Sequence, residues 1–567
     1  MPKNNRNKKR PSGKTGSHSR QHPHSDHEPR PSLIQQLSAH QGALFLALTL
    51  ITGMIVLSPY TNYHGYMAPG DHGRDFYAFE QTMQGKVPYQ DYWWVYGPLM
   101  PFFYAFSLKV LGVSAASILA AKSLLQMGAG LLLYLGLRSI IHPAFAYLAA
   151  AWFLVFHEGF FFTHNHAGGI LLIIGCTYWL LRYIRESHIQ FLWWAVACAF
   201  ILSFVKVNFG LTALVAIVLS TFIVDFSRKE NLTRSKKAFY ALAILGVPLL
   251  IAEVYWLFLR GLTSYEIRQC LPYFDADHPY NTSIFAALGI LAQGTWNQAT
   301  STWANISFGL LVTGSAVTTV HALMTRKLDP STRKTIALSV TILTILYVGN
   351  LHEFIRSGVW YRTMWSQPLG VMLSFIFIHT ALSAWSKRGQ AGAWIVLFGL
   401  MSWGLYGKAS TVSEAKSADH FLTHPKAEVY LNNSEHWIET VQDTTSFLTE
   451  NLKEDELFFA LPYDPLYYYL AERESPTRQL IFFDHINIPE EQEKKIIAEL
   501  SDKNVNYVLL SSRQSSGEQG LGILGQTYCP LIAQYIGENF QQIAQFGDWE
   551  NPAGWAWNHG TVILKRR

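Results

Sequence analysis

The sequence offers little that would indicate a redox protein, a zinc protein or a disulfide-stabilised secreted protein. Its 567 residues include only four cysteines, and these form neither a CxxC pair nor any other metal-like spacing. Cys176 and Cys198 lie within apolar runs, where cysteine is an ordinary small core residue. The cysteines therefore predict neither a disulfide framework nor a zinc site.

We also expect no cleavable signal peptide, because the first apolar run starts late and no small-residue cleavage site follows it. Residues 1–41 are basic, rich in Ser and Pro and poor in large apolar side chains, so we expect a disordered tail. Such a tail could bind nucleic acid, but a cytoplasmic positive flank of the first membrane span is the simpler interpretation. We therefore expect no nucleic-acid partner.

Charged residues are scarce, at 15% of the chain, and long uncharged runs occupy residues 42–407. A run of about 17–25 apolar residues matches the hydrocarbon core of a bilayer, and the basic segments between runs favour the cytoplasmic side. If residues 97–113 form a re-entrant or interfacial helix, all the basic segments fall inside and the C-terminus lies outside. The pattern predicts a polytopic α-helical membrane protein with about eleven transmembrane helices, at residues 42–58, 115–137, 143–157, 166–182, 190–205, 208–225, 237–258, 303–324, 335–349, 365–384 and 390–407.

With this topology, the uncommon polar clusters all lie on the external side. They occupy the first external loop, residues 59–114, and the segments around His157, Lys206, Asp275 and Arg362. Ionisable groups at membrane depth are costly and usually face a cavity or a partner. A transporter or flippase would instead place them near the midplane, within inverted repeats that this sequence does not show. The clusters predict a site at the outer membrane boundary.

The last part of the chain, residues 408–567, has an ordinary soluble composition. Residues 456–461 and 506–512 are typical of strands, and residues 489–503 and 529–540 of helices. They predict an external α/β domain. Because it has neither a glycine-rich phosphate loop nor catalytic-triad spacing, we expect it to support the site or to recognise an acceptor.

Acidic and aromatic residues alternate in the first external loop. Asp71, Asp75 and Asp91 could each act as a general base on a hydroxyl, although acidic loops are often merely solvated. Tyr89 and its aromatic neighbours could stack on a sugar or form an interfacial belt. The residues alone leave these alternatives open.

This loop contains, in order, Asp71, Tyr77, Gly85, Pro88-Tyr89-Gln90-Asp91 and Gly97-Pro98-Leu99. The order of these motifs resembles that in the GT-C superfamily of membrane glycosyltransferases, which includes protein O-mannosyltransferases and lipid A aminoarabinose transferases. The resemblance continues in residues 462–478 of the C-terminal part. It implies a GT-C-like architecture, a lipid-phosphate sugar donor, an inverting transfer, and a catalytic base at Asp71 or Asp75. Relatives often carry an Asp-Glu pair where this chain has Asp71-His72, so the choice between the two aspartates stays open.

Two later segments carry cations that could bind the donor phosphate. Lys206 and Asn208 lie between two apolar runs, and relatives often show a similar Lys there. Arg356 and Arg362 lie at the external end of another run, and arginine suits phosphate oxygens. Each of these cations could instead extend to the lipid headgroups.

The segment around His157 could bind a substrate, pack at the interface or, with Glu158, His164 and His166, ligate a divalent metal. Its spacing fits no standard metal site, so we expect no metal and no cofactor.

Together these features predict a hexosyl or pentosyl glycosyltransferase of a bacterial inner membrane, with a cytoplasmic N-terminus and a periplasmic C-terminal domain. Its partners would be membrane lipids, a polyprenyl-phosphate sugar donor, and a glycolipid, glycan or protein acceptor. The alternatives are a transporter or flippase and a non-catalytic protein of envelope-polymer assembly.

Overall fold

The computed structural model describes residues 40–58, 62–157, 163–229, 233–271, 281–325, 328–431, 437–515, 520–556 and 559–567. The expected tail at residues 1–41 lies outside these ranges except for its last two residues. Glu158, Asp275, Asp277 and His278 also lie outside them.

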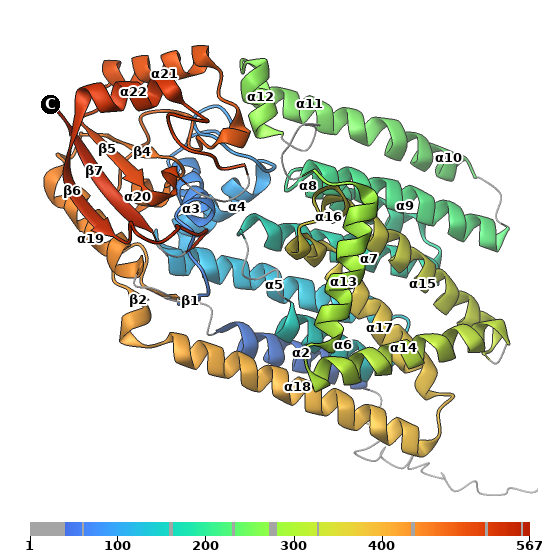
Figure 1. Cartoon of the computed structure of the whole chain (residues 1–567). Coiled ribbons are helices and arrows are strands. Elements are labelled where there is room, and N and C mark those ends of the chain that lie inside the picture. The colour runs from blue at the N-terminus through green and yellow to red at the C-terminus, as the bar shows by residue number, and fades with distance from the viewer. Residues whose placement is uncertain are drawn as a thin grey trace, which may run out of the picture.

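Long helices run side by side and form a bundle (Figure 1). A helix covers each of the eleven ranges that the sequence predicted. Within the described ranges, six helical stretches are long and apolar enough to cross a membrane. These are α5 (Ala115–Leu137), α7 (Asn165–Glu186), α9 (Val207–Arg228), α10–α11 (Arg234–Leu259), α14 (Trp303–Met324) and α15–α16 (Pro330–Ser357).

The other apolar helices are shorter and pack among the long ones. One of them, α4 (Leu99–Leu111), covers residues expected to be re-entrant or interfacial. Its 13 residues span about 20 Å, less than the thickness of a hydrocarbon core. The rest are α2 (Gln41–Leu57), α6 (Pro143–Phe156), α8 (Ile189–Ser203) and α17 (Gln367–Leu382). Helix α18 (Lys387–Ala415) belongs to neither group: it is 29 residues long and covers the last predicted range.

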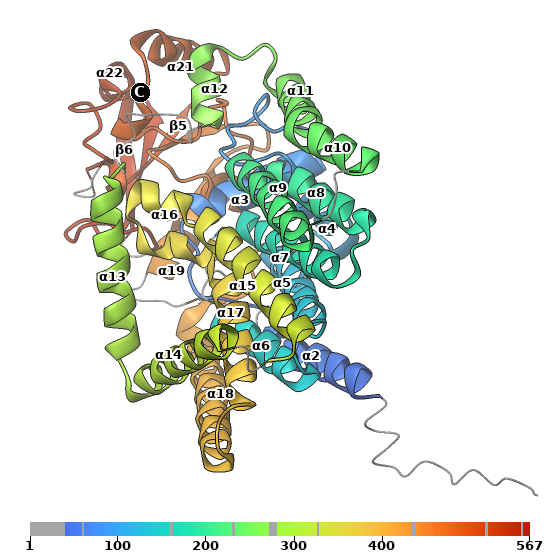
Figure 2. The same cartoon turned by 90° about the vertical axis from the view of Figure 1, so that its right-hand side faces the viewer.

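One of the helices that the sequence did not predict crosses the others. Helix α13 (Ile284–Thr300) runs across the direction of the bundle in both views (Figures 1 and 2). Its buried Ala287 packs against Leu351 and Phe354, next to α16 (His352–Ser357). It therefore braces one of the segments on which the sequence placed cations.

Residues 418–567, here called the C-terminal segment, cover one end of the bundle (Figure 1). Its main sheet has the order β4-β5-β7-β6, with β4 and β5 parallel and the other pairs antiparallel. The predicted strands and helices correspond to β4 (Phe458–Leu461), β5 (Tyr507–Ser511), α21 (Glu490–Asp502) and α22 (Pro530–Asn539). Not anticipated were α19 (Trp437–Asn451), α20 (Leu466–Leu470), β6 (Phe540–Gly547) and β7 (Gly560–Arg566).

The C-terminal segment is joined to residues 59–114 by backbone contacts. β1 (Tyr63–His64) pairs in parallel with β3 (Val429–Leu431), which in turn pairs with β2 (Phe421–Leu422). Helix α3 (Asp71–Met83) approaches α20 so closely that a Cβ on Gly73 would collide with the backbone of Leu466. Glycine is required here because only a residue without a side chain permits this approach.

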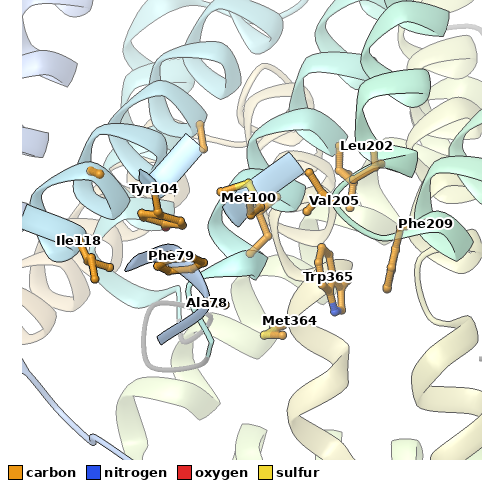
Figure 3. Close-up of a cluster of buried hydrophobic side chains, with 14 of the residues drawn as sticks. Ala78, Phe79, Met100, Tyr104, Ile118, Leu202, Val205, Phe209, Met364 and Trp365 are labelled. Atoms are coloured by element: carbon orange, nitrogen blue, oxygen red, sulfur yellow. The ribbon is translucent and has the colours of Figure 1, made fainter. Parts of the chain in front are cut away.

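Aromatic packing fixes α3 against the bundle. Phe79 of α3 stacks on Tyr104 of α4, with ring centroids 4.4 Å apart, and Trp365 stacks on Phe209 of α9 at 4.1 Å (Figure 3). All four side chains are buried within one continuous core that extends from the bundle into the C-terminal segment.

Candidate active site

A cavity of about 530 Å³ lies where α3, the start of α9, α16 and the C-terminal segment meet. Five of the nine residues singled out from the sequence line it, from three distant parts of the chain. They are Asp71, Lys206, Asn208, Arg356 and Arg362.

Asp71 is the first residue of α3, and its side chain is one-third exposed. Its Oδ1 accepts hydrogen bonds from Arg74 Nη1 at 3.3 Å and from the Tyr463 hydroxyl at 3.1 Å. Its Oδ2 accepts from Trp555 Nε1 at 3.0 Å. The carboxylate is thus held in one orientation at the edge of the cavity.

Asp75 lies one turn further along α3 and is completely buried, outside the cavity. It forms an ion pair with Arg74 Nη2 at 2.7 Å and accepts the backbone N–H of His164 at 2.9 Å. Burial alone would raise the pKa of Asp75, but Arg74 and His164 hold that pKa well below its usual range. Asp75 therefore stays ionised and fixes Arg74, which in turn contacts Asp71.

Lys206 precedes the first turn of α9, and its side chain is 6% exposed. Its Nζ lies 2.7 Å from the carboxylate of Glu353. Asn208 Nδ2 donates to the same carboxylate at 2.8 Å and lies 2.7 Å from His352 Nε2. Glu353 balances the charge of Lys206, so the excess positive potential here comes from the N-terminus of α9 and from the nearby Arg362.

The two arginines come from the interrupted stretch between α15 (Pro330–Gly349) and α17. Arg356 lies in the last turn of α16, and its Nε donates to Asn281 Oδ1 at 2.8 Å. Arg362 lies in the 3₁₀ turn η5 (Trp360–Trp365), where its charge acts on both Glu353 and Lys206. The break in the helix therefore brings both guanidinium groups to the cavity.

The remaining predicted residues lie elsewhere, for identifiable reasons. Tyr89 is buried, and its hydroxyl donates to the backbone oxygen of Tyr96, so it shapes the cavity wall indirectly. Asp91 uses its carboxylate to accept the Val87 N–H of its own turn at 2.6 Å. His157 ends α6 and stacks on Phe153, with ring centroids 4.8 Å apart. Sequence proximity to a polar cluster was not enough to place these three side chains in the cavity.

Four residues at the site were not anticipated in these roles: Arg74, Glu353, Tyr463 and Trp555. Glu353 had a detectable signal, because a carboxylate at membrane depth requires a partner such as Lys206. Tyr463 and Trp555 had none, since they meet Asp71 only through the folding of residues about 390 and 480 positions away. Among the described residues, no group of three or more His, Cys, Asp or Glu side chains is arranged to hold a metal ion.

Next to Tyr463, the buried Asp464 predicts a pH effect on stability. Burial raises the pKa of Asp464 from 3.8 to about 6. A 2.7 Å hydrogen bond from Ser511 and the nearby charge of Arg513 act in the opposite direction and lower that pKa, but burial has the larger effect. Between pH about 4 and 6 the folded state therefore binds more protons than the unfolded state, so stability should fall by up to about 1.4 kcal/mol per pH unit as pH rises. Asp464→Asn should remove this contribution.

Apparent melting temperatures of the full chain at several pH values between 4 and 7.5 would measure this effect. Asp502→Asn, an exposed aspartate of the same segment, is the matched control and should behave like the wild type. An unchanged pH dependence in Asp464→Asn would contradict the assignment.

Comparison with solved structures identifies the fold. ArnT from Cupriavidus metallidurans in the apo state matches with a TM-score of 0.53 and 12% sequence identity, over 93% of this chain and 98% of that one. ArnT bound to undecaprenyl phosphate matches with a TM-score of 0.52 and 10% identity over the same shares. The oligosaccharyltransferase AglB from Archaeoglobus fulgidus matches with a TM-score of 0.49 and 11% sequence identity, over 85% of this chain and 70% of that one. No family model and no curated protein sequence matches the chain.

The class is therefore that of multi-pass membrane proteins with a GT-C-like fold, as the motifs between Asp71 and Leu99 implied. Within that class, the similarity to ArnT extends over almost the whole of both chains.

Proposed function

We propose that this protein is a GT-C-type glycosyltransferase that moves a sugar from a polyprenyl-phosphate donor to an acceptor hydroxyl. One observation carries the proposal: a carboxylate on α3, a lysine before α9 and two arginines between α15 and α17 line a single cavity. The fold shared with ArnT, one structure of which contains undecaprenyl phosphate, supports a lipid phosphate as the ligand.

The proposed topology has eleven spans within residues 42–407, a cytoplasmic N-terminus and an external C-terminal segment. The cavity then opens at the external face of a bacterial inner membrane. Its position at the end of the bundle favours an enzyme over a transporter, whose site would lie near the midplane.

In the proposed reaction, Asp71 accepts the proton of the acceptor hydroxyl while that oxygen attacks the anomeric carbon of the donor sugar. The bond between the anomeric carbon and the phosphate oxygen breaks, and its electron pair leaves with the polyprenyl phosphate. The configuration at the anomeric carbon is inverted. Asp71 is preferred to Asp75 as the base because it borders the cavity, whereas Asp75 is buried in an ion pair.

Lys206, Arg356 and Arg362 would bind the phosphate and stabilise the charge that grows on it as the bond breaks. Asn208 would orient the same group or the sugar. Tyr89 would act indirectly through Tyr96, and the contacts of Asp91 and His157 give them no direct part. No metal is needed in this scheme because the cations of the chain take the phosphate.

The test is an assay of purified protein in lipid nanodiscs with radiolabelled polyprenyl-phosphate hexoses and pentoses. The expected result is sugar release or transfer together with free polyprenyl phosphate. Comparative glycan and lipid profiling of a deletion strain would identify the acceptor through the modification that disappears. A wild-type protein inert with every donor, and an unchanged profile in the deletion strain, would favour a transporter or a non-catalytic assembly protein.

A further inference from the structure

Among the described residues, Asp71 accepts hydrogen bonds from three side chains, two of which belong to the C-terminal segment. The Tyr463 hydroxyl donates to Oδ1 and the Trp555 indole N–H donates to Oδ2, at 3.1 and 3.0 Å. The third donor is Arg74, whose Nη1 also donates to the Tyr463 hydroxyl at 3.1 Å. Arg74, Tyr463 and Asp71 thus form a closed triangle on the Oδ1 side.

These bonds leave Asp71 with one open acceptor position. An ionised carboxylate has about four lone-pair positions, two on each oxygen. Arg74 and Tyr463 occupy both positions on Oδ1, and Trp555 occupies one on Oδ2. Among the described residues the remaining position belongs to Oδ2, on a side chain that borders the cavity.

We infer that Tyr463 and Trp555 are positioning residues that aim the free lone pair of Asp71 Oδ2 at the acceptor hydroxyl. The inference rests on the proposed role of Asp71 as the base. Proton transfer requires the hydroxyl and the base within about 2.6–3.2 Å in a suitable direction, so a rotation of the carboxylate would reduce turnover. The C-terminal segment therefore completes the catalytic group itself.

The surroundings of Tyr463 make it a rigid donor. It is buried between Trp93 and Phe483, with ring centroids 6.0 and 6.2 Å away. Burial raises the pKa of its hydroxyl well above the ordinary value, although Arg74 opposes this, so the group keeps its proton at neutral pH. Gly70 permits the contact, because a Cβ there would lie within 2.5 Å of the Tyr463 ring.

Trp555 approaches from the other side of Asp71. Its ring lies 5.3 Å from His72 and 6.4 Å from Tyr66, measured between centroids. The two aromatic neighbours belong to the same loop and helix as Asp71 itself. The indole is therefore packed against the element that carries the carboxylate, which fixes the direction of its N–H.

The test compares variants that remove only the donor atom. Trp555→Phe and Tyr463→Phe should each lower kcat about tenfold, with little change in KM or in affinity for undecaprenyl phosphate, because the ring and the cavity wall remain. Trp549→Phe and Tyr528→Phe are matched controls in the same segment. Their donors bond the backbone oxygens of Phe546 and Gln514 at 3.2 Å, and these variants should retain wild-type kcat.

A double-mutant cycle on thermal unfolding provides a readout that needs no activity. The losses in melting temperature of Trp555→Phe and Asp71→Ala should not add, because both remove the same hydrogen bond; those of Trp549→Phe and Asp71→Ala should add. Additive losses for the first pair would overturn the inferred contact.

The outcomes separate the inference from the proposed function. A wild type that transfers sugar, with Trp555→Phe and Tyr463→Phe at wild-type kcat, overturns the inference alone. A wild type that transfers nothing overturns the proposed function and the positioning role with it, whatever the cycle shows. Reduced kcat at constant KM, together with non-additive melting losses, supports both.

Discussion

Asp71→Asn is expected to abolish sugar transfer while the protein stays folded and still binds its lipid-phosphate donor. An amide is nearly the same size as a carboxylate, and its one carbonyl oxygen can still accept the hydrogen bonds of Arg74 and Tyr463. Its NH₂ group cannot accept the Trp555 N–H, and the amide cannot take a proton from a hydroxyl. General-base catalysis contributes about 10²–10⁴-fold, so turnover should fall by that factor. Donor affinity should change little, because the cations that would bind the phosphate lie on other elements.

Two other aspartates serve as comparisons in the same assay. Asp91→Asn should retain activity, because Asp91 only caps its own turn. Asp75→Asn should lose stability instead, by about 3–5 kcal/mol, because it leaves the buried guanidinium of Arg74 without its closest counter-charge. Full activity in Asp71→Asn, or a stable but inactive Asp75→Asn, would transfer the role of base to Asp75.

The arrangement of helices was predictable because it follows from local composition. Each long apolar run became a helix, and the range 115–137 coincides with α5. Helix α13 escaped prediction because its apolar first half is followed by Gln293, Thr295, Asn297 and Gln298, which leaves too short a run for a span. A helix across the bundle is decided by its packing against α16, which composition does not reveal.

The site was predictable only in part, and the two aspartates illustrate why. Asp71 and Asp75 are one helical turn apart, so spacing places both on the same side of α3. What distinguishes them is depth: Asp75 faces Arg74 and His164 in the core, whereas Asp71 borders the cavity. That difference depends on α7 and the C-terminal segment, which are remote in sequence.

Lys206→Met is expected to weaken binding of undecaprenyl phosphate about 10–100-fold. The Lys206 ammonium group is buried among aromatic rings, with the centroids of Phe209 and Trp365 at 5.3 and 5.2 Å, and a hydrogen bond from such a charge to phosphate contributes about 1.5–3 kcal/mol. The same substitution leaves Glu353 buried without its cation, which should cost about 3–5 kcal/mol of stability. A single variant therefore cannot separate phosphate binding from a purely structural ion pair.

The double variant Lys206→Met/Glu353→Gln makes that separation. Removing both charges takes away the unpaired carboxylate, so the melting temperature should recover most of what Lys206→Met alone loses. Donor affinity should stay low, because the recovered stability brings back no cation. Glu353→Gln alone should bind undecaprenyl phosphate at least as tightly as the wild type, since Lys206 keeps its charge and no carboxylate competes for it. If the double variant instead binds the lipid phosphate like the wild type, Lys206 serves only the fold, and phosphate recognition falls to Arg356 and Arg362.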